Sequence, residues 1–106
     1  MAVIILPDAQ EDLLSLQAYM LEKWSEAEWL KAEDEIFEKL ALVDTGLQAG
    51  APVQDLSIVG IVEYQNVFTS HHKLVYRRID GDTFLYAVAR HRQDYATLLM
   101  KRLLRI

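Results

Sequence analysis

The sequence predicts an α+β fold in which a helical hairpin packs on one face of a mainly antiparallel sheet. Two observations support this fold class. Residues 8–24 and 25–43 each repeat apolar side chains at helical spacing, and residues 71–95 contain two runs rich in Val, Leu, Tyr and Phe around Asp80-Gly81. Because only a residue or two separates the helices, they are expected to fold back on each other and face a common sheet. The predicted order is β-α-α-β-β-β, with a short closing helix.

The length and the composition limit the kinds of protein that this chain can be. A chain of 106 residues has the size of one domain, so residues 1–106 are expected to form a single domain. The absence of cysteine excludes disulfides and thiolate metal sites. The N-terminal apolar run is short and follows no basic segment, so it predicts neither a signal peptide nor a membrane anchor. We therefore expect a cytoplasmic protein that does not contact a membrane.

The net charge of −5 is unevenly distributed along the chain. Residues 1–50 contain eleven acidic side chains against three lysines, a balance of −8, whereas residues 51–106 contain five acidic side chains against eight basic ones, a balance of +3. A uniformly acidic protein would repel nucleic acid, but this chain can present a basic face from its C-terminal half. Any contact with nucleic acid is therefore expected to be local.

The first half of the chain contains a predicted strand and the two helices. The strand is expected at Val3–Leu6, because this run is β-branched and is followed by proline. Asp8 and Glu11 have the spacing of a capping box, which predicts the start of the first helix, and Ser25 and Glu28 repeat it for the second. The apolar stripes consist of Ala9, Leu13, Leu16, Met20 and Trp24 in the first helix, and of Trp29, Ala32, Ile36, Leu40 and Val43 in the second.

The second half is predicted to contain most of the sheet. Residues 46–57 include two glycines and a proline and are expected to form a loop. Residues 58–68 have the composition of a strand, but the polar pair Gln65-Asn66 interrupts it. Two interpretations therefore remain: one bent strand, or a strand with a bulge. Asp80-Gly81 tolerates the positive φ angles of a hairpin turn. A closing helix is expected from Tyr95 onward.

Basic residues are concentrated on the predicted hairpin and beyond its end. Side chains alternate between the faces of a strand, so residues 71–79 divide into two sets. We expect the helices to cover the face that carries His72, Leu74, Tyr76 and Arg78. The opposite face is expected to stay uncovered, with Lys73 and Arg77 pointing into it and the following residues arriving from the neighbouring strand: Arg90, His91 and Arg92. Cations that converge without paired acids predict a site for phosphates or for a partner's carboxylates.

The same residues limit the chemistry that the predicted site can perform. His71 and His72 are adjacent, so their side chains point in opposite directions and cannot bind one metal ion together, and we predict neither a metal site nor a cofactor. Asp94 is interpreted as the N-cap of the closing helix rather than as a catalytic acid. His91 is the one side chain of the cluster that exchanges protons near neutral pH. If the protein is an enzyme, the cluster supports a metal-independent ribonuclease with these catalytic candidates: His91, Arg92, Lys73, Arg90 and Tyr95.

The order and spacing of these segments resemble the RelE/ParE superfamily of bacterial type II toxin–antitoxin toxins. The resemblance is carried by the pattern Ala9-x-x-Asp12-Leu13-x-x-Leu16-x-x-Tyr19 and by the hairpin KLVYRRIDGDTFLYAVARHRQDY. The segment His72–Tyr76 is similar to the HRLVY segment of the YoeB-like nucleases, with Lys73 where those have a phosphate-binding Arg. The tail Arg92–Tyr95, followed by leucines, looks instead like the R-x-D ending and closing helix of ParE-like toxins. The acidic net charge, and residues 60–70 without any basic side chain, favour the ParE branch.

Membership of the ParE branch implies a toxin that inhibits DNA gyrase and is neutralised by direct binding of a cognate antitoxin, in a hetero-oligomer of unknown stoichiometry. Trp29 or Tyr19, if exposed, would anchor the antitoxin. The expected target- and antitoxin-binding residues are Lys73, Arg77, Arg90, His91, Arg92, Lys101, Arg102 and Arg105. Two alternatives remain open: a RelE/YoeB-like mRNA endoribonuclease that acts with the ribosome, with His91 as general acid, and an inactive module that retains the fold.

Overall fold

The computed structural model describes residues 2–91, 93 and 95–103, and within these ranges it does not describe the side chains of residues 55, 95, 96 and 103. The α+β class and the predicted succession of elements are confirmed, with a short strand and a short helix added between the second helix and the hairpin. The elements are β1 (Val3–Ile5), α1 (Pro7–Lys23), α2 (Glu26–Asp44), β2 (Ala51–Pro52), α3 (Gln54–Ser57), β3 (Gln65–Phe68), β4 (His72–Ile79), β5 (Asp82–Arg90) and α4 (Tyr95–Leu103).

The strands form one mixed sheet in the order β1-β5-β4-β3-β2. β1 runs parallel to β5, and the other neighbouring pairs are antiparallel. Asp80 and Gly81 form the turn between β4 and β5, with φ angles of 53° and 85°. Positive φ at both central residues is the geometry of a two-residue hairpin turn whose twist matches the strands, so the predicted hairpin is confirmed.

A bulge in β5 changes the register of the hairpin halfway along. Tyr76 pairs with Leu85, but the preceding residue Val75 pairs with Ala87, so Tyr86 is an extra residue without an opposite partner on β4. Since the side-chain period of a strand is two, one extra residue moves every later side chain of β5 to the other face. The bulge therefore decides on which side of the sheet the end of β5 presents its side chains.

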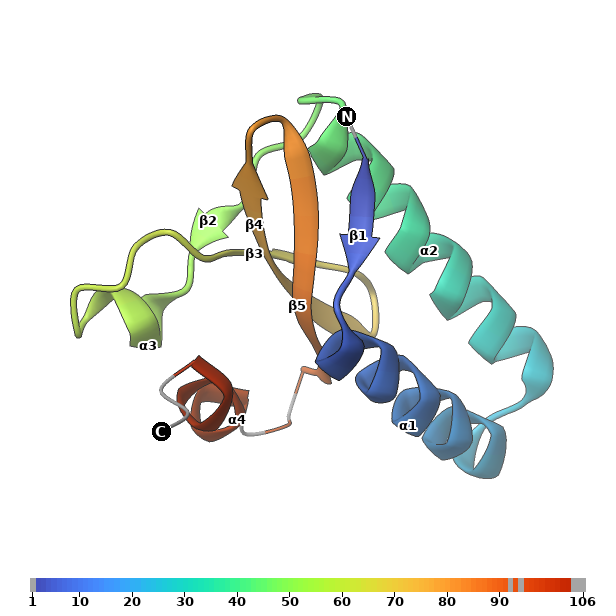
Figure 1. Cartoon of the computed structure of the whole chain (residues 1–106). Coiled ribbons are helices and arrows are strands. Elements are labelled where there is room, and N and C mark those ends of the chain that lie inside the picture. Colours follow the sequence, from blue (N-terminus) through green and yellow to red (C-terminus); the bar gives the residue numbers. More distant parts are fainter. Residues whose placement is uncertain (1, 92, 94, 104–106) are drawn as a thin grey trace.

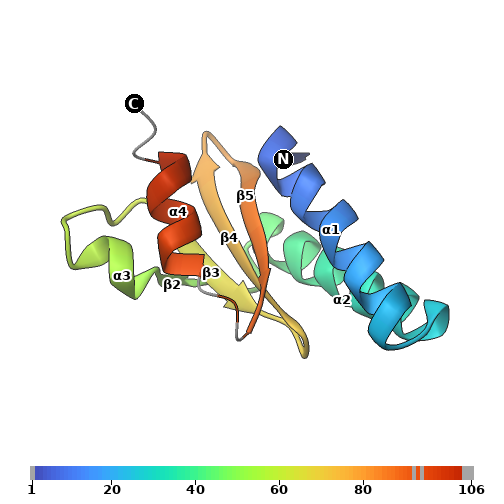
Figure 2. The same ribbon diagram turned by 90° about the horizontal axis from the view of Figure 1, so that it is seen from below.

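Helices cover both faces of the sheet, with α1 and α2 on one side and α3 and α4 on the other (Figures 1 and 2). Leu74 and Tyr76 belong to the larger core under α1 and α2, which confirms the predicted assignment of that face. The prediction that the opposite face stays uncovered is wrong. Val75 and Ala87 are buried there in a second core, which also contains Val53, Leu56 and Leu99. This face of the sheet is therefore covered by apolar residues of the segment that was predicted to be a loop and of the closing helix.

The two long helices begin differently. α1 starts at Pro7 with Leu6 as N-cap and has no side-chain cap, so the capping box predicted at Asp8 and Glu11 is wrong. Proline at the first helical position lacks an amide that would need capping, and its fixed φ suits the helix, which explains the earlier start. α2 begins as predicted, since the Oγ of Ser25 accepts a hydrogen bond from the Glu28 amide at 3.2 Å.

The segment between α2 and β4 differs most from the predictions. Residues 46–57 contain β2 and α3 instead of a plain loop, and the strand expected over 58–68 is limited to β3. Gly60 has a φ of +85°, which turns the chain after α3, and the Gln65-Asn66 pair begins β3 rather than interrupting it. Position 50 also requires glycine, because an added Cβ would lie 2.5 Å from the Tyr76 hydroxyl oxygen. Among the described residues, no helix is long and apolar enough to cross a membrane.

Candidate functional site

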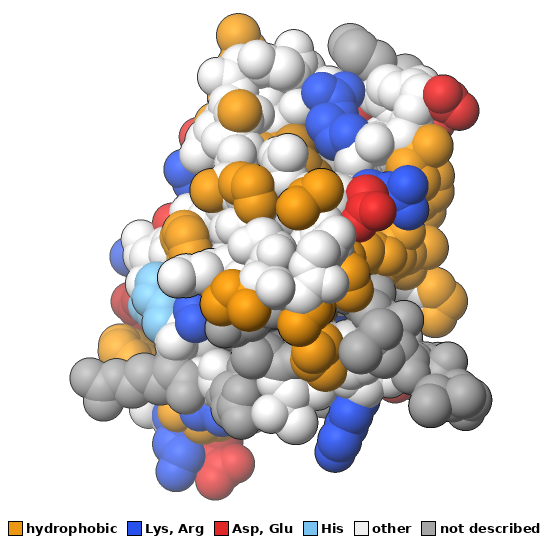
Figure 3. Space-filling view, turned by 90° about the vertical axis from the view of Figure 1, so that its left-hand side faces the viewer, with side chains coloured by type: hydrophobic (Ala, Val, Ile, Leu, Met, Phe, Trp, Pro, Cys, Tyr) orange, Lys and Arg blue, Asp and Glu red, His pale blue; other side chains and the backbone are white. Residues whose placement is uncertain are grey.

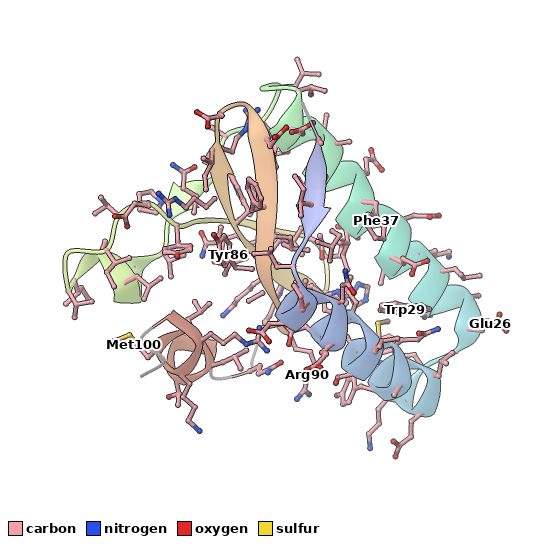
Figure 4. All side chains as sticks on the ribbon, viewed as in Figure 1. Glu26, Trp29, Phe37, Tyr86, Arg90 and Met100 are labelled. Atoms are coloured by element: carbon pink, nitrogen blue, oxygen red, sulfur yellow. The ribbon has the colours of Figure 1, made fainter. Side chains whose placement is uncertain are left out.

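The basic residues of the hairpin lie on both sides of the sheet. In the β4–β5 ladder His72 is opposite Arg90, whereas Lys73 is opposite Ala89. Opposite residues share a face, so Arg90 lies on the side of α1, and Lys73 lies on the other side. The guanidinium carbon of Arg90, a residue labelled in Figure 4, sits 4.2 Å from the centre of the Tyr19 ring on α1. The predicted convergence of Arg90 with Lys73 and Arg77 is therefore wrong.

The bulge at Tyr86 is the physical reason for this difference. If the register at the turn, where Ile79 pairs with Asp82, continued without a bulge, Arg90 would pair with His71 and share the face of Lys73. The extra residue moves Arg90 to the side of α1. Figure 3, which views the α3 side, shows basic side chains that lie apart from one another between hydrophobic ones.

Arg77 lies beside an aromatic pair on the α4 side. Its guanidinium carbon is 6.0 Å from the centre of the Tyr64 ring, and that ring meets Tyr86 edge to face with centroids 4.9 Å apart. Burial raises the pKa of the Tyr64 hydroxyl, and the neighbouring Tyr86 raises it further while Arg77 opposes the shift. Tyr64 therefore stays a neutral phenol that Arg77 can stack against.

Arg102, one of the predicted binding residues, is neutralised inside the molecule. Its two terminal nitrogens donate to the Asp12 carboxylate at 2.6 and 2.7 Å, a bidentate pair that joins α4 to α1. Asp12 also accepts from the Val88 amide at 3.0 Å, and the Tyr86 carbonyl oxygen accepts from Arg102 at 3.4 Å. The hydrogen bonds with Asp12 raise the pKa of the Arg102 guanidinium. This arrangement holds α4 against α1, and the Asp12 carboxylate balances the positive charge of Arg102 inside the molecule.

The other predicted binding residues are only partly described. Lys101 is exposed on α4, and Lys73 and Arg77 are partly exposed on β4. Arg92 and Arg105 lie outside the described residues, as do the predicted N-cap Asp94 and the side chain of Tyr95.

A pocket of about 250 Å³ opens between the C-terminal half of α1 and the ends of β4 and β5. We call it the histidine pocket. His72 is buried, and its burial, with the nearby His71 next in importance, lowers its pKa from 6.5 to about 4. The Nε2 atom of His91 lies 3.2 Å from the His72 carbonyl oxygen, which accepts a hydrogen bond from it. The lining residues are Tyr19, Met20, Trp24, Ser70, His71, His72, Arg90 and His91.

The sequence did not predict this pocket, because its lining residues come from segments far apart in the chain. The Trp24 ring at the end of α1 meets His71 edge to face at 5.7 Å between centroids. Glu35 of α2 accepts from the Ser70 amide at 2.6 Å and from its hydroxyl at 3.0 Å, which fixes the loop before β4. Over the described part of the chain, no group of three or more His, Cys, Asp or Glu side chains is placed to hold a metal ion.

A second depression, of about 360 Å³, lies between α1 and α2 and is called the α1–α2 groove. Leu14 and Phe37 border it and are 66% and 44% exposed. Trp29 forms part of its wall but is only 3% exposed, so it does not project as the predicted anchor, and Tyr19 is half-buried beneath Arg90. The groove is lined by Ile5, Gln10, Leu13, Leu14, Gln17, Trp29, Glu33 and Phe37.

Comparison with known families gives the identity of this fold. The family model described as the ParE toxin of the type II toxin–antitoxin system, parDE, matches residues 3–95. The chain belongs to the ParE toxin family. The match spans nearly the whole chain and confirms the resemblance to the RelE/ParE superfamily, on the ParE side.

A solved structure supports the fold of this ParE family member. The structure is described as the chromosomal ParDE TA system from P. aeruginosa, and the two folds superpose with a TM-score of 0.67 at 15% sequence identity. The similarity covers 85% of this chain and 95% of that chain. Among curated protein sequences, no significant match was found.

The described catalytic candidates for a ribonuclease assemble only in part in this ParE family member, since Arg90 and His91 both line the histidine pocket but Lys73 lies apart from them. Lys73 and Arg90 lie on opposite faces of the sheet, and Arg90 is stacked on an α1 side chain. His91 is engaged with a backbone carbonyl oxygen at the mouth of the histidine pocket. A phosphodiester bound beside Lys73 would therefore have Arg90 on the far side of the sheet.

Proposed function

We propose that this ParE family member is a toxin that inhibits DNA gyrase and is neutralised by direct binding of a cognate antitoxin in a hetero-oligomer. The family match over residues 3–95 is the observation that carries the proposal. The net charge of −5 supports a protein target over the ribosome, because a nuclease in the ribosome has to approach densely packed phosphate. The division of Lys73 and Arg90 between two faces of the sheet also favours gyrase inhibition over mRNA cleavage.

We assign gyrase contact to the side of the molecule that carries α3 and α4, where side chains around the second core stay partly exposed. Lys73 and Arg77 lie on this face of β4, and Lys101 is exposed on α4. Separate cations at the edge of an interface steer association and fix register, while the binding free energy comes mainly from buried apolar and aromatic contacts. The Tyr64 and Tyr86 pair, partly buried beside Arg77, would supply such contacts.

We assign the antitoxin to the α1–α2 groove. Leu14 and Phe37 leave a large apolar area open to solvent, and neighbouring exposed apolar side chains of this size mark interaction surfaces in soluble proteins. The groove runs beside β1, which is the edge strand of the sheet. An antitoxin segment with apolar side chains at helical spacing would bury these side chains, as in other helix-in-groove complexes.

Substitution in the groove tests the antitoxin assignment. Phe37→Glu is expected to weaken binding of the antitoxin by about 30-fold or more, because a charge at an apolar contact costs about 2 kcal/mol or more. Ile58→Glu is the matched control, since Ile58 is 74% exposed on the segment after α3, outside the groove. Calorimetry with the purified antitoxin measures both, and equal affinities for the two variants would place the antitoxin elsewhere.

Controlled expression distinguishes gyrase inhibition from the alternative ribonuclease. Gyrase inhibition predicts growth arrest with relaxed plasmid DNA and DNA breaks, and antitoxin expression is expected to restore growth. Primer extension on translated mRNA provides the other readout. New cuts that disappear in His91→Ala would contradict the proposal and establish an mRNA endoribonuclease, and unaffected growth would indicate an inactive module.

A further inference from the structure

The histidine pocket is separate from the surfaces assigned above. It shares no lining residue with the α1–α2 groove, and Arg90 reaches it from the α1 side of the sheet. We infer that the histidine pocket is a docking site for a partner protein's acidic side chain, with an apolar side chain of the same segment packed on Trp24. This inference does not depend on gyrase being the target.

The charge of the pocket favours an anionic group. Arg90 is the only lysine or arginine among the eight described lining residues, and none of them is acidic. Its guanidinium carbon lies 4.2 Å from the centre of the Tyr19 ring, a cation–π contact that favours this position of the donors before a ligand arrives. The nearby Glu35 is engaged by the Ser70 amide and hydroxyl. A planar carboxylate matches a fixed guanidinium better than any other side-chain group does.

Two imidazoles leave hydrogen-bonding capacity unused. The Nδ1 atoms of His71 and His72 are shielded from solvent and have no hydrogen-bond partner in the described part of the chain. A buried polar atom without a partner costs free energy, and such atoms in folded proteins call for an explanation. His72 is only 1% exposed, and burial lowers its pKa to about 4. Its ring is therefore neutral near pH 7 and adds no positive charge to that of Arg90. A ligand that enters between the rings would relieve part of this cost.

The size and the walls of the pocket favour a protein side chain over a cofactor. Its volume of about 250 Å³ is below the usual range of cofactor and drug sites, about 300–1,000 Å³. Trp24, one of the lining residues, is 58% exposed. Trp, Tyr and Arg are the residue types enriched at the centres of protein interfaces, and Trp24, Tyr19 and Arg90 meet here.

NMR titration of the full chain with small probes tests the inference. Protein labelled with ¹⁵N and made by cell-free synthesis avoids any toxicity. The probes are N-acetyl-Glu-Phe amide, its uncharged match N-acetyl-Gln-Phe amide, and phenyl phosphate. We expect the Glu probe to shift the Trp24 indole and Arg90 side-chain signals with a Kd of about 1 mM, and to bind about tenfold more tightly than the Gln probe.

Substitutions test whether the charge of Arg90, rather than the folded state alone, determines the affinity for the Glu probe. Arg90 is exposed, so Arg90→Gln is expected to stay folded and to lower the affinity for the Glu probe about tenfold, while leaving the Gln probe unchanged. Arg77→Gln, on the other face, is the matched control and is expected to bind like the wild type. Trp24→Ala is expected to weaken both probes. Equal affinity for the Glu and Gln probes, tighter binding of phenyl phosphate, or no saturable shift would each overturn the inference.

Discussion

Replacing Asp12 by asparagine is expected to loosen α4, because the Asp12 carboxylate joins three elements. It binds Arg102 of α4 through two hydrogen bonds of 2.6 and 2.7 Å, and it accepts from the Val88 amide of β5 at 3.0 Å. β1 ends its pairing with β5 at Leu85, so the Val88 amide lies on an edge without a strand neighbour. The carboxamide oxygen of the variant can still accept from that backbone amide, and the substitution therefore tests the charge and the second oxygen alone.

The expected magnitude follows from the burial of the pair. The Asp12 and Arg102 side chains are 11% and 17% exposed, so each would be left largely desolvated without its partner. Breaking fully buried pairs costs about 3–5 kcal/mol, and partial exposure reduces this, so we expect about 2 kcal/mol for Asp12→Asn and about 2 kcal/mol for Arg102→Met. The double variant is expected to lose about the same amount as either single one, which gives a coupling energy of about 2 kcal/mol.

Urea unfolding of the wild type and the three variants measures this coupling. The control cycle uses Glu28 and Lys31, whose side chains are 38% and 78% exposed at a separation of 4.0 Å, and it should give less than about 0.5 kcal/mol. A coupling energy below about 0.5 kcal/mol for Asp12 and Arg102 would mean that the pair does not hold α4 in solution.

Two further predictions concern buried polar contacts. The lowered pKa of His72, from 6.5 to about 4, means that the unfolded chain binds more protons between these values, so stability should fall by about 2 kcal/mol from pH 7 to pH 5 through this residue alone. Urea unfolding at both pH values should show that His72→Leu loses about 2 kcal/mol less stability than the wild type between pH 7 and pH 5. An unchanged pH dependence would contradict the lowered pKa of His72. Gly50→Ala should cost about 2 kcal/mol, because its Cβ would lie 2.5 Å from the Tyr76 hydroxyl oxygen. Thermal unfolding should show a smaller cost of Gly50→Ala in a Tyr76→Phe background, which lacks the hydroxyl that the Gly50 amide donates to, than in the wild type, and full additivity would argue against the close contact.

Local signals in the sequence predicted most of the fold. The two helices, the Ser25 cap, the turn at Asp80-Gly81 and the closing helix all follow from periodicity or from backbone preferences of a few adjacent residues. The β2 and α3 elements were missed because two and four residues are too few to show a period. The second core had a visible signal, since Val75 and Ala87 are apolar on the face that was expected to be open.

The placement of the cations could not be predicted in the same way. Arg102 is neutralised by Asp12, 90 residues away, and no local pattern reveals a pair at such a separation. Arg90 changes sides because of a single unpaired residue, Tyr86, and strand alternation alone does not locate a bulge. The histidine pocket depends on the bulge, because Arg90 lines it only from the side of α1.

The most direct test of gyrase inhibition is a supercoiling assay with purified components. Relaxed plasmid, DNA gyrase and ATP are incubated with increasing amounts of the purified chain, with and without its antitoxin. Gyrase inhibition predicts loss of supercoiling with the chain alone and full recovery with a stoichiometric amount of antitoxin. It also predicts weaker inhibition by Lys73→Glu combined with Arg77→Glu, since both residues lie on the face assigned to gyrase. Undiminished supercoiling in the presence of excess folded chain would contradict gyrase inhibition.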